Sequence, residues 1–273
     1  MKTIKLLSLI LASFILFIYA CDDNDGTAKF NLHLIDATGD YAEVLIHITG
    51  AEVHFETEDG EGQWKTLNVD DRIYDLLKLT NGEEVLLASE DLPAGTISQI
   101  RLILGEGNSV VIEGEEVDAE GEPITEEFDL TTPSAQTSGL KLNIHAQLEA
   151  GLTYDLTLDF NVDKSIVKTG SGKYNLKPVI RTYTKATSGA IEGFVTPFDS
   201  ETSVSIIVNG DVISTLINEK TGYFMLSGIP EDNYDVLFTP GDLNAYLEQT
   251  VNVVVSVGVI TEIEPVELEA VSP

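Results

Sequence analysis

The sequence predicts an all-β protein made of two antiparallel β-sandwich domains in tandem. Three observations support this fold class. Hydrophobic and polar residues alternate in short runs along most of the chain, turn residues such as glycine and asparagine separate these runs, and no stretch has the 3.6-residue period of an amphipathic helix. The 273 residues are enough for two domains that each bury a hydrophobic core.

The clearest alternation lies in residues 138–181. Leu140 to Leu148 and Leu152 to Phe160 each place hydrophobic side chains at every second position, and Glu149-Ala150-Gly151 separates the two runs. This spacing predicts an antiparallel hairpin. A third strand is expected from Lys173 to Thr184, where Pro178 indicates an edge position or a bulge because proline lacks an amide donor.

Similar runs predict the other strands of a first domain over residues 28–184. Residues 44–55 and 100–104 alternate, and residues 110–130 predict an acidic hairpin. Tyr74 to Leu79 fits either a strand or a short helical turn, and Asn81-Gly82 predicts a tight turn.

Several short motifs of this first domain occur together and in order. They are Leu34-Ile35-Asp36-Ala37, Val53-His54, Tyr74-Asp75-Leu76-Leu77, Leu92-Pro93-Ala94-Gly95, Ile100-Arg101-Leu102, Ser138-Gly139-Leu140-Lys141-Leu142, Leu158-Asp159-Phe160, Lys164-Ser165-Ile166-Val167 and Leu176-Lys177-Pro178-Val179-Ile180-Arg181. Over about residues 28–184 this set resembles the bacterial lipoprotein family catalogued as domain of unknown function 4382. The resemblance implies an exported, β-rich domain and supplies no catalytic residue.

The composition changes after a short polar linker, residues 185–189. Beyond it Lys220 is the only basic residue, and Asn209-Gly210 predicts a hairpin turn. The run Thr221 to Pro230, followed by Asn233-Tyr234-Asp235-Val236, resembles the carboxypeptidase regulatory-like, transthyretin-like sandwich. The resemblance implies that residues 190–270 form an accessory module, often associated with carbohydrate or protein binding.

The N-terminus has the three regions of a secretory signal peptide over residues 1–20. Lys2 and Lys5 precede an apolar run of about 14 residues, which is shorter than the roughly 20 needed for a membrane span. The only cysteine, Cys21, lies at the expected cleavage site, and this arrangement resembles a bacterial lipoprotein signal in which Cys21 is lipidated. Plain secretion with an unmodified Cys21 is the alternative.

An acidic cluster follows directly within a tether of residues 21–27. Asp22, Asp23 and Asp25 resemble the surface-export signal of Bacteroidota lipoproteins. We therefore expect a protein that a lipid anchors in the outer membrane and that faces the cell exterior.

Charge restricts the classes of partner. The chain has 46 acidic residues against 15 lysines and arginines, a net charge of −31, and loss of the two lysines with residues 1–20 would make it −33. Such a surface repels phosphate backbones, so nucleic-acid binding is not expected. Cationic partners remain compatible with it, although excess charge also serves solubility.

No motif predicts catalysis. Ser165-Ile166-Val167-Lys168 and Lys168-Thr169-Gly170 look like β-lactamase motifs but share Lys168, whereas the enzymes need them on separate elements. The four histidines lie opposite the apolar faces of their strands, without a spacing that demands zinc. We therefore expect a non-enzymatic protein without an obligatory cofactor.

Three sets of residues are candidates for binding. Trp64, beside a glycine-rich loop, and Tyr246, in the connection Gly241 to Leu247, could stack on sugar rings, although burial in the core is the alternative for Trp64. Asp118, Glu120 and Glu122 lie in one turn and could supply oxygen ligands to calcium, although such turns are more often solvated.

Together these features favour a cell-surface binding or adhesion module, with a glycan or a surface protein as its partner. The alternative is a structural subunit or stalk of a surface assembly, similar to β-sandwich pilins. Exposed aromatic rings would favour the first function, and an unpaired hydrophobic edge strand would favour the second.

Overall fold

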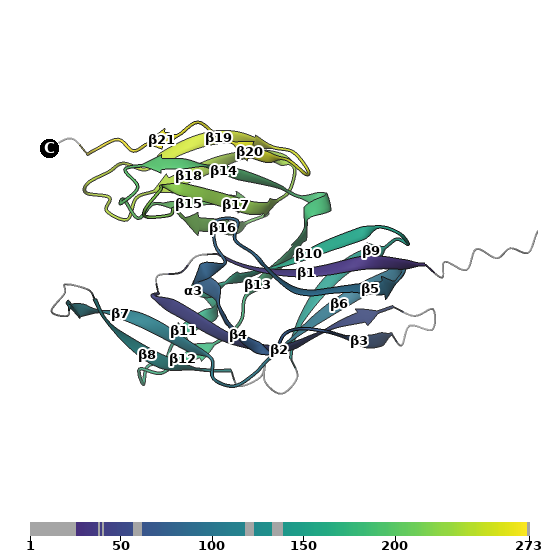
Figure 1. Cartoon of the computed structure of the whole chain (residues 1–273). Coiled ribbons are helices and arrows are strands. Elements are labelled where there is room, and N and C mark those ends of the chain that lie inside the picture. Colours follow the sequence, from purple (N-terminus) through teal and green to yellow (C-terminus); the bar gives the residue numbers. More distant parts are fainter. Residues whose placement is uncertain are drawn as a thin grey trace, which may run out of the picture.

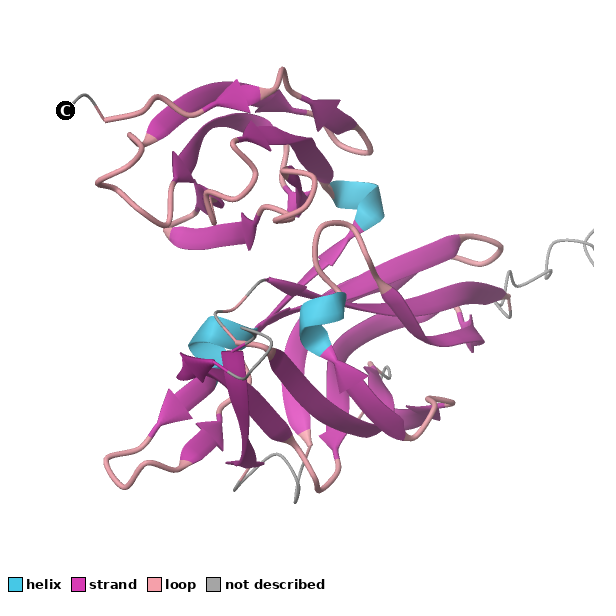
Figure 2. Cartoon of the chain, turned by 60° about the vertical axis from the view of Figure 1, so that its left-hand side comes forward, coloured by secondary structure: helices cyan, strands magenta, loops and turns pink. Residues whose placement is uncertain are grey.

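The computed structural model describes residues 26–37, 39, 41–56, 62–117, 123–132 and 139–271. Over these residues the chain is almost entirely β-structure, as predicted, with only single turns of helix (Figures 1 and 2). Buried hydrophobic residues form two separate clusters, one between Ala28 and Leu176 and the other between Ile191 and Leu268. We call the parts around them the N-terminal unit (27–184) and the C-terminal unit (189–271).

The N-terminal unit contains two sheets. The first has the order β13 (Ile180–Thr184), β10 (Thr153–Asn161), β1 (Thr27–Ala37) and β5 (Val85–Pro93). β1 is central, because it pairs in parallel with β10 and antiparallel with β5. The first strand of the described chain is therefore part of the middle of its sheet.

The second sheet is longer. Its order is β11 (Ile166–Lys168), β12 (Tyr174–Leu176), β8 (Pro123–Thr131), β7 (Ser109–Val117), β2 (Glu43–Phe55), β6 (Gly95–Leu104) and β9 (Leu140–Leu148), with β3 (Gln63–Leu67) and β4 (Arg72–Asp75) also paired to β2. The predicted acidic hairpin is present as β7 and β8. Short helices η1 (Leu76–Lys78) and α3 (Val162–Ser165) both contact β1.

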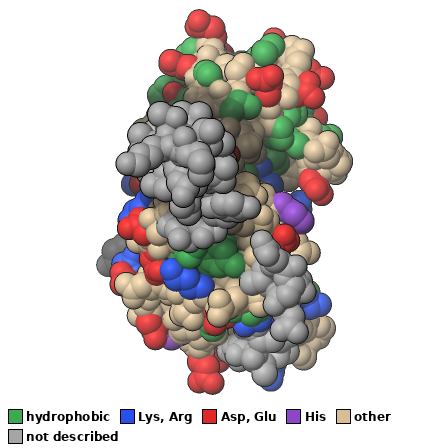
Figure 3. Space-filling model, turned by 90° about the vertical axis from the view of Figure 1, so that its right-hand side faces the viewer, with side chains coloured by type: hydrophobic (Ala, Val, Ile, Leu, Met, Phe, Trp, Pro, Cys, Tyr) green, Lys and Arg blue, Asp and Glu red, His purple; other side chains and the backbone are tan. Residues whose placement is uncertain are grey.

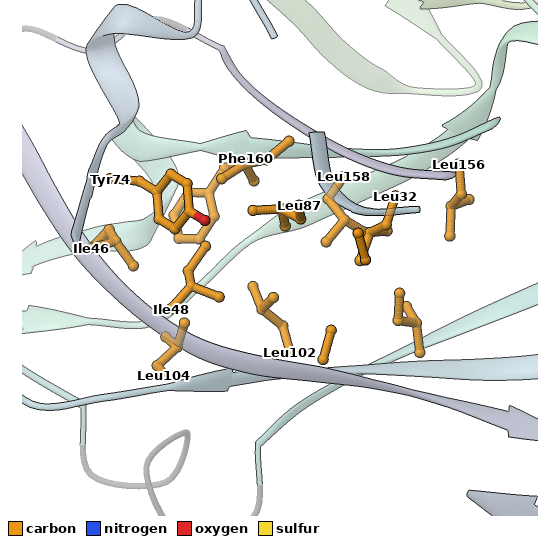
Figure 4. Packing of buried hydrophobic residues seen from close by; sticks show 14 of the residues in the cluster. Leu32, Ile46, Ile48, Tyr74, Leu87, Leu102, Leu104, Leu156, Leu158 and Phe160 are labelled. Atoms are coloured by element: carbon orange, nitrogen blue, oxygen red, sulfur yellow. The ribbon is translucent and has the colours of Figure 1, made fainter. Parts of the chain in front are cut away.

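The core of the N-terminal unit lies between these sheets. Leu32 of β1 and Leu158 of β10 approach Leu102 of β6 and Ile48 of β2 from the opposite side (Figure 4). All four side chains are at most 1% exposed. Burial of such a side chain stabilises a fold by about 1.5 to 3 kcal/mol, so the alternating leucines and isoleucines account for the packing of the two sheets.

The predicted hairpin of residues 140–148 and 152–160 is wrong. β9 pairs with β6 in the second sheet, whereas β10 pairs with β1 and β13 in the first. The turn at Glu149 to Gly151 therefore carries the chain from one sheet to the other. Leu156 to Phe160 are all buried, which is typical of a strand covered on both faces, and alternation alone does not identify a strand's neighbour.

Pro178 divides the third predicted strand. β12 ends at Leu176 and joins the second sheet, and β13 begins at Ile180 and forms an edge of the first. Residues 74–79 contain both predicted alternatives, since β4 ends at Asp75 and η1 follows it.

The C-terminal unit also contains two sheets. One consists of β17 (Tyr223–Ile229), β14 (Gly189–Thr196) and β20 (Ile260–Glu262), with β21 (Val266–Glu267) on β14; the other has the order β16 (Asp211–Leu216), β15 (Ser203–Val208), β18 (Asp232–Thr239) and β19 (Gln249–Val255). Phe224 and Phe238 meet edge to face between the sheets. The predicted turn joins β15 to β16, with positive φ at both Asn209 and Gly210.

Helix η2 (Lys185–Thr187) connects β13 to β14, and the C-terminal unit lies against one end of the N-terminal unit (Figure 1). No helix in the described part of the chain has the length and hydrophobicity needed to cross a bilayer.

Candidate ligand-binding face

Trp64 lies on the outer face of the second sheet. It belongs to β3, directly opposite His54 of β2, and its side chain is half-buried and outside the core cluster. The neighbouring outward positions are Glu52, Gln99, Arg101, Lys141 and Asn143, on β2, β6 and β9. We call these seven residues the Trp64 face.

Cationic side chains surround the indole ring. The guanidinium carbon of Arg101 is 4.1 Å from the ring centroid, and Lys141 Nζ is 5.7 Å from it. The His54 ring lies 4.9 Å away at an angle of 57°. Arg101 Nη1 also donates to Glu52 Oε2 at 2.7 Å, so the pair holds the guanidinium over the ring.

Glycine provides the space for this packing. At Gly139, where φ is +68°, an added Cβ would overlap the aliphatic stem of Arg101, and at Gly62, where φ is +66°, it would overlap the His54 ring. Both backbone conformations favour glycine. The absence of a side chain at Gly139 and Gly62 thus leaves room for Arg101 and His54 beside Trp64.

Amides and hydroxyls extend the face toward edge strand β9. Gln99 Nε2 donates to Asn143 Oδ1 at 3.0 Å, and Thr96 Oγ1 donates to Gln147 Oε1 at 2.8 Å. Asn143, His145 and Gln147 are all exposed, as is Lys141. An aromatic ring beside several amide, hydroxyl and ammonium donors is the composition that binds sugar hydroxyl groups and carboxylates.

Tyr246, the other predicted stacking residue, lies elsewhere. It packs against the core of the C-terminal unit, and its backbone forms an isolated bridge with Ala270. The structure does not bring it near Trp64. The N-terminal candidates Cys21, Asp22, Asp23 and Asp25, and the calcium candidates Asp118, Glu120 and Glu122, lie outside the described residues.

Three of the four histidines occupy separate environments, and the fourth, His145, is exposed on β9. His33 lies between Glu84 and Asp155, His47 hydrogen-bonds to Asp71 at 2.6 Å, and His54 contacts Trp64. The bond to Asp71 raises the pKa of His47. Within the described ranges no three histidine, cysteine, aspartate or glutamate side chains form a group able to hold a metal ion.

A cavity of about 340 Å³ lies where the two units meet. Asp159, Arg181 and Tyr183 line it from the N-terminal unit, and Met225 and Ser227 line it from the C-terminal unit. Arg181 donates to Asp159, and also to the carbonyl oxygens of Gly228 at 2.6 Å and Ser227 at 2.9 Å. Burial raises the pKa of the Tyr183 hydroxyl. Arg181 thus links the two sides of the cavity.

Asp36, near this junction, is a buried carboxyl group at the end of β1. Its Oδ1 accepts a hydrogen bond from the Val162 amide at 3.3 Å, and its Oδ2 has no protein partner. Burial, with a smaller contribution from the nearby Asp159 carboxylate, raises the pKa of Asp36 to about 10. Asp36 is therefore protonated at neutral pH.

The model of a known family matches residues 27–178, more than half of the chain, and is described as "Domain of unknown function (DUF4382)". The chain belongs to the DUF4382 family. This confirms the resemblance of the first domain, and the DUF4382 match contains all of the Trp64 face. It ends before the C-terminal unit, whose resemblance to the carboxypeptidase regulatory-like sandwich stays a prediction.

Three solved structures are distantly similar to this DUF4382 protein. The Bacillus anthracis TIE protein is 14% identical with a TM-score of 0.25, and the match covers 90% of this chain and 34% of the TIE protein. The minor pilin GBS52 of Streptococcus agalactiae is 10% identical with a TM-score of 0.26, over 90% of this chain and 97% of that pilin. The shaft pilin SpaA of Lactobacillus rhamnosus is 10% identical with a TM-score of 0.28, over 91% and 99%. A search of curated proteins gave no match.

Sequence reasoning identified Trp64 in the DUF4382 domain but missed Arg101, Lys141 and Asn143. Alternation does place these three on the outer sides of their strands. Their proximity to Trp64 depends on the pairing of β2 with β3 and β6, and of β6 with β9. The two pairings that involve β6 join residues more than 30 apart in the sequence. Local periodicity does not contain that information.

Proposed function

We propose that this protein is a non-enzymatic, lipid-anchored surface module that binds carbohydrate through the Trp64 face. The observation that carries the proposal is the half-buried indole surrounded by Arg101, Lys141, His54 and the amides of β6 and β9. Arg101 covers part of the ring, so a sugar would stack on the indole surface that remains accessible. Exposed donors on β9 would then contact its hydroxyl groups.

The charge of the face favours acidic sugars. In the described part of the face Glu52 is the one acidic side chain, and it is paired with Arg101. Lys141 is exposed and lies in none of the ion pairs found among the described residues. Its ammonium group is thus available to a uronic or other carboxylated sugar, in a chain that is otherwise strongly acidic.

Calorimetry and glycan arrays test this function on the lipid-free protein, with and without calcium. We expect Trp64→Ala to weaken binding by about tenfold or more, because stacking on the ring is lost. Phe194→Ala, which removes an exposed aromatic ring from the C-terminal unit, is the matched control and should bind normally. Absence of binding to every glycan, or equal binding by Trp64→Ala, would refute the proposal.

The proposed location depends on Cys21 and the acidic residues after it. We expect Cys21→Ser to abolish metabolic labelling with a fatty acid and to release the protein from membranes. Replacement of Asp22, Asp23 and Asp25 by asparagine should retain labelling but remove the protein from the cell surface, as measured by protease shaving. Surface exposure of both variants would contradict this mechanism of export.

One observation favours the alternative role as an assembly subunit. Edge strand β19, Gln249–Val255, has neither a charged residue nor a proline, and Val254 is 65% exposed. Such an edge can accept a further strand. A subunit of this kind should form concentration-dependent oligomers in sedimentation experiments, and Val254→Lys should abolish them. A monomer at all concentrations would argue against this second function.

A further inference from the structure

Three aromatic residues of the C-terminal unit gather on its surface. Phe194 of β14 lies opposite Tyr223 of β17, with ring centroids 5.5 Å apart and an angle of 60°. Phe198 follows β14 and lies against Gly222, the residue before Tyr223. Phe194 is 42% exposed and Phe198 is 47% exposed. We call Phe194, Phe198 and Tyr223 the aromatic patch.

Carboxylates lie beside these rings. The Tyr223 hydroxyl donates to Glu192 Oε2 at 2.8 Å, and Glu192 of β14 is in register with Glu262 of β20. Asp199 follows Phe198 directly in the sequence. Residues of like charge side by side on a sheet repel each other unless a cation is present.

The C-terminal unit contains almost no cations of its own. Residues 188–273 include 14 aspartates and glutamates and one lysine, Lys220. Every ion pair found among the described residues lies in the N-terminal unit or in the adjoining η2. In Figure 3 acidic and hydrophobic side chains are interspersed on the visible face of the upper, C-terminal unit.

The same contrast holds for the aromatic rings. Trp64, Tyr74, Tyr174 and Tyr183 of the N-terminal unit each have an arginine or lysine from the same chain over the ring, between 4.1 and 5.7 Å from its centroid. No such contact occurs in the described part of the C-terminal unit, although Phe194 and Phe198 are exposed there.

We propose that the aromatic patch binds a lysine- or arginine-rich segment of a partner protein. The cationic side chains of that segment would lie over the faces of Phe194 and Phe198, where the π electrons attract them. Glu192, Glu262 and Asp199 would neutralise the remaining charge and speed association. This contact is separate from the Trp64 face and would let one protein hold a glycan and a basic protein segment together.

The test uses the complete lipid-free protein and a fluorescent peptide of nine arginines, with anisotropy as the readout. The uncharged control is the same peptide with citrulline in place of arginine. We expect the double variant Phe194→Leu/Phe198→Leu to bind the arginine peptide about tenfold more weakly, because leucine keeps the apolar surface but removes the π electrons. Glu192→Gln should also weaken binding, and thermal unfolding checks that each variant is folded.

Two controls make the test specific. Ile207→Ser, at an exposed position on the other sheet of the unit, and Trp64→Ala should both bind the arginine peptide as the wild type does. Equal binding of the wild type and the double leucine variant would show that carboxylates alone attract the peptide. Equal binding of the citrulline peptide would show apolar docking. Either result, or no binding at physiological salt, overturns the proposal.

Discussion

Arg181 and Asp159 form the ion pair on which the contact between the two units is centred. Both Nε and Nη2 of Arg181 donate to Asp159 Oδ2, at 3.0 and 2.5 Å, while the same guanidinium donates to two carbonyl groups of β17. The Asp159 side chain is only 9% exposed. Burial raises its pKa, although Arg181 opposes this effect. One guanidinium therefore neutralises a buried charge and links β13 to the C-terminal unit.

Removal of this guanidinium should loosen the junction. We expect Arg181→Ala to lower the free energy of unfolding by about 3 kcal/mol, because Asp159 would remain buried and unpaired. Calorimetry should then show separate transitions for the two units, and protease should cleave more rapidly near η2. Lys185→Ala is the control, since the exposed Lys185–Glu84 pair should contribute at most about 1 kcal/mol. Similar unfolding of both variants would mean that Arg181 does not couple the units.

Gly228 is required at the same junction for steric reasons. Its φ is +67°, and an added Cβ would overlap the Tyr183 ring. Gly258 is the matched control, because its φ is +71° and a Cβ there meets open space. Both alanine variants should lose about 1 kcal/mol for the left-handed backbone, and Gly228→Ala should lose about 2 kcal/mol more for the overlap.

A double variant separates the loss of stability caused by the left-handed backbone from the loss caused by overlap with the Tyr183 ring. In a Tyr183→Ala background the overlap is gone, so Gly228→Ala should cost only as much as Gly258→Ala. Urea unfolding of the four variants measures the difference. If Gly228→Ala lowers the free energy of unfolding by the same amount with and without Tyr183, the Tyr183 ring is not the reason for glycine at position 228.

Features set by residues adjacent in the sequence could be predicted, whereas contacts between distant strands could not. Asn209-Gly210 correctly predicted its hairpin, because both residues tolerate the positive φ of that turn. The alternation of Leu140 to Leu148 and of Leu152 to Phe160 predicted a second hairpin, yet β9 and β10 belong to different sheets. An inward-facing leucine such as Leu148 or Leu158 fits either sheet. For the same reason Trp64 could be recognised as a candidate, whereas its neighbour Arg101 could not.

Asn81 also links the two units. Its φ is +54°, and its Oδ1 accepts hydrogen bonds from Thr215 Oγ1 at 3.1 Å and from the Met225 amide at 3.3 Å. We expect Asn81→Gly to lose about 1 kcal/mol of stability, because the turn is kept but the acceptor is removed. Asn209→Gly is the control, since Asn209 occupies a similar turn within one unit. Chemical denaturation that ranks Asn209→Gly as the more harmful change would contradict this role.

Asp36 should make stability depend on pH. Its folded-state pKa of about 10 lies above the ordinary value of 3.8, so the folded protein keeps a proton that the unfolded chain releases. Below about pH 4 both states are protonated and Asp36 has no effect on the free energy of unfolding. Between about pH 4 and pH 10 its ionisation in the unfolded state lowers stability, by roughly 4 kcal/mol at pH 7.

Asp36→Asn removes this effect while it preserves an oxygen acceptor for the Val162 amide. The variant should therefore unfold at a temperature close to that of the wild type at pH 4 and become progressively more stable than the wild type toward pH 8. Asp211→Asn, an exposed position on β16, controls for the loss of one negative charge. If the difference between Asp36→Asn and the wild type is independent of pH, Asp36 ionises in the folded protein and is not held in its protonated form.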